Sequence, residues 1–73
     1  MTSIDPERLQ FVIGEVHKLN QGDPRTRDAA CEFKYGSYIF SRLGIRGTST
    51  AGPQWAVANW LRLAERRLRE ARK

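Results

Sequence analysis

The sequence has few of the residues from which metal centres and disulfide frameworks are built. It contains one cysteine, Cys31, and one histidine, His17, among 73 residues. A single cysteine forms no internal disulfide, and the two residues together are too few for a structural zinc site. Because small secreted domains usually depend on disulfides, the lone thiol favours a reducing cytoplasm. We expect no metal and no other cofactor.

Long apolar runs are also missing. No segment approaches the run of about eighteen apolar residues that indicates a membrane-spanning helix, and the N-terminus lacks the pattern of a signal peptide. Neither an internal repeat nor a low-complexity tract is present. We therefore expect one soluble domain over residues 1–73, located in the cytoplasm and without a membrane partner.

Apolar residues recur at helical spacing in three segments, whereas period-two alternation never lasts beyond a few residues. Ser3 or Asp5 before Pro6, and Asp23 before Pro24, are typical of helix starts, and Gly44 is typical of a helix end. The sequence therefore predicts an all-α fold, a small three-helix bundle with helices over residues 6–19, 24–43 and 53–72. Its predicted core is Leu9, Ile13, Val16, Phe33, Phe40, Leu43, Val57, Leu61 and Leu68.

Positive charge is concentrated in the second half of the chain. Residues 1–41 carry five basic and six acidic side chains, and residues 42–73 carry eight basic and two acidic ones, so the local net charges are −1 and +6. A localised positive field attracts phosphate backbones and acidic proteins alike. The partner is therefore expected to be nucleic acid or an acidic protein surface.

The last predicted helix places its basic residues on one side. At about 100° per residue, one stripe gathers away from the apolar face, with a tryptophan pointing the same way; its members are Trp55, Arg62, Arg66, Arg69 and Lys73. Arginine grips phosphate or carboxylate with two parallel hydrogen bonds, which favours a binding surface. The alternative is an ordinary solvated face whose cations complement the helix dipole.

A second face is predicted on the middle helix, opposite its apolar stripe. It consists of Cys31, Tyr35, Tyr38 and Arg42. Tyrosine and arginine are enriched at protein interfaces, so this face is a candidate contact for a protein partner or for a second copy of the chain. The alternative is two ordinary exposed tyrosines, which are common on protein surfaces.

Residues 38–63 resemble helix-turn-helix DNA-binding domains at two places. Leu43-Gly44-Ile45 is similar to the turn of that motif, and Val57-Ala58-Asn59-Trp60 is similar to the middle of its recognition helix. The turn is about seven residues longer than in the compact motif. The resemblance implies that Gln54, Trp55 and Asn59 face DNA bases, and that Arg46, Arg62 and Arg66 contact phosphates.

Residues suited to catalysis are scattered along the chain. His17 lies at the margin of the first helical stripe and Cys31 on another helix, and a three-helix domain this small offers little cleft. We expect a non-enzyme, and two functions fit the sequence. One is a small regulatory protein that binds nucleic acid through its basic C-terminal helix. The other is an adaptor or phage-type inhibitor that binds a host protein complex through the tyrosine face and the arginine stripe.

Overall fold

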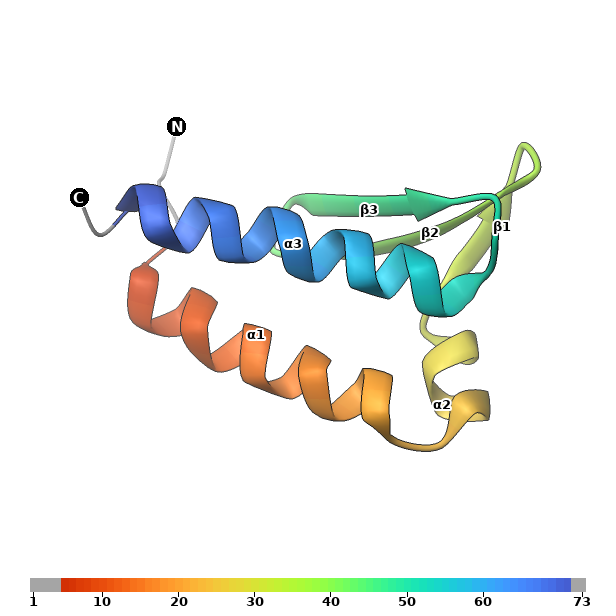
Figure 1. The fold of residues 1–73 in the computed structure, drawn as a ribbon, viewed down its shortest axis with the longest axis horizontal. Coiled ribbons are helices and arrows are strands. Elements are labelled where there is room, and N and C mark those ends of the chain that lie inside the picture. Colours follow the sequence, from red (N-terminus) through yellow and green to blue (C-terminus); the bar gives the residue numbers. More distant parts are fainter. Residues whose placement is uncertain (1–4, 72–73) are drawn as a thin grey trace.

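Between residues 5 and 71, three helices and a three-stranded antiparallel sheet make up the fold (Figure 1). The computed structural model describes residues 5–71. In chain order the elements are α1 (Pro6–Gln21), α2 (Pro24–Ala29), β1 (Glu32–Lys34), β2 (Ser37–Arg42), β3 (Ile45–Ser49) and α3 (Pro53–Ala71). The prediction of an all-α three-helix bundle is therefore wrong, because the fold combines helices with a sheet.

The helix starts follow directly from local sequence. The Asp5 carboxylate accepts a hydrogen bond from the Glu7 N–H, and the Asp23 carboxylate accepts one from the Arg25 N–H. In each case the proline that follows the aspartate stands at the first helical position, where its missing N–H costs nothing. The first and last predicted helices are present as α1 and α3, and the middle one begins as predicted at α2.

The predicted helix over residues 24–43 is wrong beyond Ala29, because two tight turns fold this segment into strands. Tyr35 and Gly36 have φ of 54° and 77°, and Leu43 and Gly44 have φ of 54° and 73°. Two consecutive residues with positive φ make the turn that joins twisted antiparallel strands, and they cannot belong to a right-handed helix. The strand order is β1-β2-β3, with Lys34 opposite Ser37 and Arg42 opposite Ile45 at the turns.

Helix α3 is the central element of the fold. It packs on β3 and β2, and on its other side it runs antiparallel beside α1 (Figure 1). Its contact with the sheet depends on Gly47 in β3. A Cβ at this position would lie 2.5 Å from the Trp60 backbone nitrogen and would press on the Ala56 carbonyl oxygen. Glycine therefore allows the helix backbone to approach the strand closely.

One apolar cluster forms the core of the described chain. Its members are Leu9, Ile13, Val16, Phe40, Ile45, Ala56, Val57, Trp60, Leu61 and Ala64. Of the predicted core, Leu43 and Leu68 are only partly buried. Phe33 is 61% exposed, and its prediction as a core residue is wrong because it lies on the edge strand β1, whereas α3 packs on β3 and β2.

Trp60 is the largest of the fully buried side chains. Its indole N–H donates to the Arg42 carbonyl oxygen at 3.2 Å, and its ring meets Phe40 edge-on with centroids 5.7 Å apart. The guanidinium of Arg42 lies over the other aromatic ring of this pair, 4.6 Å from the Phe40 centroid. Trp60 thus joins the central helix to strand β2 through both packing and a hydrogen bond.

Candidate nucleic-acid interface

The exposed side of α3 carries three arginines and a tryptophan. Trp55, Arg62, Arg66 and Arg69, here called the cationic face, lie within about 60° of one another around the helix axis. All four side chains are exposed, and Trp55 is 54% exposed. The buried residues of the same helix occupy the opposite side, because Val57, Leu61 and Ala64 face the core. Lys73, which the sequence places in this stripe, lies outside the described residues.

Little negative charge neutralises the cationic face. Arg66 Nε lies 3.6 Å from Glu70 Oε1, one helical turn further on, and both side chains are exposed. Exposed ion pairs of this kind contribute about 0.2–1 kcal/mol, so Arg66 can exchange Glu70 for another anion at small cost. Within residues 5–71, no carboxylate comes within ion-pair distance of Arg62 or Arg69. The face therefore has a surplus of positive charge.

Asn59 is already engaged within the protein. Its amide nitrogen donates to the Thr48 carbonyl oxygen at 2.7 Å, and its amide oxygen accepts a hydrogen bond from the Arg62 guanidinium at 3.0 Å. Both ends of the amide are thus occupied, and bidentate pairing of Asn59 with adenine would require both of these bonds to break. Asn59 instead ties α3 to the edge of β3 and orients Arg62.

Two further predicted contacts lie away from the exposed arginines. Arg46 lies on β3 between the buried Ile45 and Gly47, so its side chain points to the face of the sheet that is turned away from α3. Gln54 is half-buried, and its side-chain amide lies against Gly52. The structure therefore brings neither residue to the cationic face as a free base-reading or phosphate-binding group.

The residues that carry the helix-turn-helix resemblance lie on a β-turn, a strand and a helix. Leu43 and Gly44 form the β2–β3 turn, and Ile45 begins β3. Val57 and Trp60 are buried in α3, facing the core. The helix that precedes the turn in that motif is replaced here by strand β2.

The four residues predicted as one tyrosine face do not share a helical face in the structure. Tyr35 is fully exposed at the tip of the β1–β2 hairpin, whereas Tyr38 is half-buried on β2. Arg42 packs on Phe40, and Cys31 precedes β1. The predicted helical face is wrong because this segment is a hairpin rather than a helix.

Cys31 has a structural environment at the junction of α2 and α3. Its thiol lies 3.6 Å from the Arg27 carbonyl oxygen and 3.8 Å from that of Pro53. Burial raises the pKa of the Cys31 thiol, and the nearby Asp28 carboxylate raises it further, against opposing effects of Arg27 and Arg42. The thiol is therefore protonated at neutral pH and is a poor nucleophile.

The hairpin presents an aromatic cluster that the helical interpretation missed. Phe33 and Tyr38 pair across β1 and β2, and their ring centroids are 4.8 Å apart. With Tyr35 at the tip, these are the hairpin aromatics. The hairpin reaches beyond the start of α3 at one end of the molecule (Figure 1). The available signal was the pair of aromatic-rich segments separated by Tyr35-Gly36.

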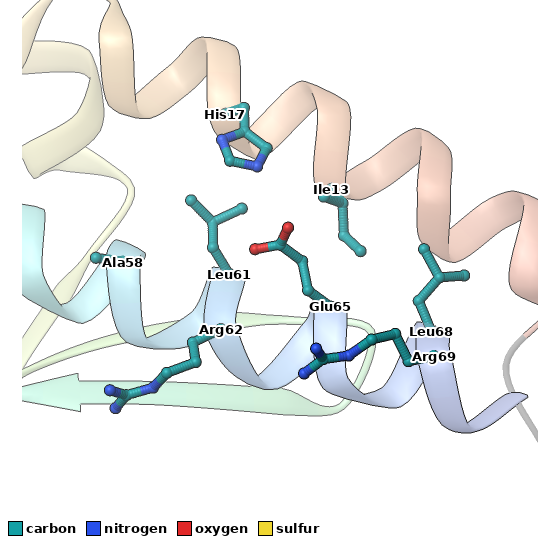
Figure 2. Close-up of a pocket in the computed structure, with 8 residues that line it drawn as sticks. All are labelled: Ile13, His17, Ala58, Leu61, Arg62, Glu65, Leu68 and Arg69. Carbon is teal, nitrogen blue, oxygen red and sulfur yellow. The ribbon is translucent and has the colours of Figure 1, made fainter.

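A shallow groove of about 500 Å³ runs between α1 and α3 beside the cationic face (Figure 2). Its lining residues are Ile13, His17, Ala58, Leu61, Arg62, Glu65, Leu68 and Arg69. The Glu65 side chain points toward α1, whereas the Arg62 side chain extends away from it, and Arg69 lies alongside α3 (Figure 2). Two members of the cationic face thus border an apolar floor. Periodicity predicted both helices but not the groove between them.

Comparison with protein families, curated proteins and solved structures finds no match. Between residues 5 and 71, no three histidine, cysteine, aspartate or glutamate side chains are grouped as a metal site requires. No helix of the same region is both long enough and apolar enough to cross a membrane.

Proposed function

We propose that this chain is a small non-enzymatic regulatory protein that binds nucleic acid through the cationic face of α3. Arg62, Arg66 and Arg69 are its phosphate contacts. The observation that carries the proposal is the exposure of these arginines on one helical face with a single weak ion pair among them. The lone unpaired cysteine supports a cytoplasmic location.

Geometry favours phosphate as the group that arginines in this arrangement bind. Successive guanidinium groups start from backbone positions about 6 Å and about 4.5 Å apart along the helix axis. A guanidinium donates two parallel hydrogen bonds to neighbouring phosphate oxygens and keeps its charge at every physiological pH. Each phosphate contact releases condensed counterions, so binding should weaken as salt rises.

Substitution of all three arginines by glutamine should abolish most of this binding. Glutamine has nearly the same helix propensity as arginine, so α3 is retained while three positive charges are removed. We expect the slope of log affinity against log salt to become shallower by about 2 to 3 units, because each lost contact removes about one unit. Fluorescence anisotropy with labelled single-stranded and duplex DNA, between about 50 mM and about 200 mM salt, measures this slope.

A matched control removes the same charge elsewhere. Arg8, Lys18 and Arg25 are exposed on α1 and α2, and their replacement by glutamine lowers the net charge equally. This variant should keep most of the wild-type affinity and slope. Equal losses in the two triple variants would show that net charge, and not the cationic face, is responsible. Tighter binding of the wild type to polyglutamate than to DNA would instead favour an acidic protein partner.

The hairpin aromatics support a second candidate function, docking to a protein as an adaptor or inhibitor. Tyr35 is fully exposed and Phe33 is 61% exposed, at the end of a projecting hairpin. Exposed tyrosine and phenylalanine side chains are typical of contact surfaces, since they supply large apolar area with little flexibility. The same surface would serve for pairing with a second copy of the chain.

Tyr35→Asn tests the docking role without disturbing the turn. Asparagine adopts positive φ more readily than tyrosine, so the hairpin should be retained while its most exposed ring is removed. We expect the wild-type chain to self-associate at high concentration and the variant to sediment as a monomer. A wild-type chain that sediments as a monomer at every concentration would argue against this candidate.

A further inference from the structure

We infer that the polynucleotide bound by the cationic face is single-stranded, with Trp55 as the platform on which one base stacks. This inference rests on the proposed function and adds the class of ligand. Trp55 would hold a base through its ring, and the arginines of the same face would hold the phosphates that follow along the strand.

Trp55 lies in line with the arginines of the cationic face, and its ring is accessible to a ligand. It precedes Arg62 by seven residues and Arg69 by fourteen, so it lies about 10 Å and about 21 Å from them along the axis and on nearly the same side. Within the described chain its indole pairs with no other aromatic ring and makes no side-chain hydrogen bond. Half of its surface faces water.

Trp60, five residues later on the same helix, has a different environment from Trp55. Trp60 is completely buried, packs on Phe40 and donates its indole N–H to Arg42. Packing and hydrogen bonding within the fold therefore account for Trp60 and do not account for the exposed half of Trp55. An exposed indole among arginines is a surface suited to a ligand that has both flat rings and negative charge.

A single strand fits this combination better than a duplex does. In a duplex the base faces are stacked on one another, and a protein reaches only phosphates and the donor and acceptor edges in the grooves. The polar groups that would read those edges, Asn59 and Gln54, are engaged with Thr48 and Arg62 or packed against Gly52. In a single strand the base faces are accessible, and stacking tolerates every base.

Sequence and sugar should matter little for such binding. The face offers guanidinium groups for phosphates and one ring for a base, and its engaged amides leave no group dedicated to a base edge or a 2′-hydroxyl. We therefore expect DNA and RNA strands of the same length to bind with similar affinity.

The test compares oligo(dT), oligo(U) and a DNA duplex, each about 15 nucleotides long, with wild type and three variants. The wild type should bind both single strands more tightly than the duplex at the same salt concentration. Trp55→Ala should weaken single-strand binding about tenfold to a hundredfold, as expected for loss of one stacked base, and leave duplex binding unchanged. Trp55→Phe, which keeps a ring, should restore most of the affinity.

Phe11→Ala is the matched control. Phe11 is 68% exposed on α1, so the variant removes an exposed ring that lies off the cationic face and should bind as the wild type does. Equal or tighter binding of the duplex, or unchanged single-strand affinity in Trp55→Ala, would overturn the inference and leave the proposed function standing. Failure of the wild type to bind either form at low salt would overturn both.

Discussion

Gly47→Ala should destabilise the protein by about 3 kcal/mol, because the added methyl group meets backbone atoms of α3. The nearest atoms are the Ala56 carbonyl oxygen and the Trp60 nitrogen and Cα, which cannot move without shifting the helix. A domain of this length has a total stability of about 4 to 11 kcal/mol, so the loss is a large part of it. Urea denaturation followed by circular dichroism should show a clearly lower midpoint.

Gly14→Ala provides the control for this experiment. Gly14 lies within α1, and a Cβ there meets nothing within 4 Å. Since alanine favours a helix interior over glycine by about 1 kcal/mol, the same chemical change should here stabilise the protein. If Gly47→Ala proved as stable as the wild type, the close approach of α3 to β3 would be wrong.

Trp60→Ala should cost about 3 to 5 kcal/mol, the usual range for removal of a fully buried aromatic side chain. Trp60→Phe separates the packing of the indole ring from its hydrogen bond. It keeps a ring beside Phe40 but leaves the Arg42 carbonyl oxygen without its donor, and we expect a loss of about 1 to 3 kcal/mol. Chemical denaturation of the three proteins under the same conditions measures both steps.

Trp55→Ala is the internal comparison for Trp60. Because Trp55 is half exposed at the start of the same helix, its replacement should change stability by much less than that of Trp60. Similar losses at the two positions would contradict the assignment of one tryptophan to the core and of the other to the surface.

The starts of α1 and α2 and the helix α3 could be predicted because their determinants are local. Asp5-Pro6 and Asp23-Pro24 start helices by themselves, and the apolar spacing of α3 follows from its own residues. The exposure of Arg62, Arg66 and Arg69 follows from the same spacing. Their role in binding stays a prediction.

The sheet could not be predicted because it depends on two turns whose backbone conformations the residue types do not favour. Gly36 and Gly44 are compatible with a close helix crossing and a helix end, and they became turn residues only with Tyr35 and Leu43 at positive φ. Such φ values are unfavourable for tyrosine and leucine, so local propensity argues against the turns that form. Pairing of β2 with both neighbours and burial of Phe40 under α3 favour them instead.

At the candidate site, the hydrogen bond of Asn59 to Thr48 could not be predicted from the sequence either. Its position on the exposed side of α3 is local information, whereas its bond to Thr48 depends on where β3 lies. Arg46 is displaced for a related reason, since alternation along β3 turns it away from the helix. Residues whose partners come from distant elements are thus the ones that sequence spacing misplaces.

The central position of α3 has a consequence for the thermodynamics of binding. The helix that carries the arginines is held on one side by α1 and on the other by the sheet, so its backbone cannot loosen without disruption of the core. The backbone that carries its charged side chains is therefore already ordered in the free protein. Association needs to restrict only a few side chains, and the entropic cost of forming a helix has already been met by folding.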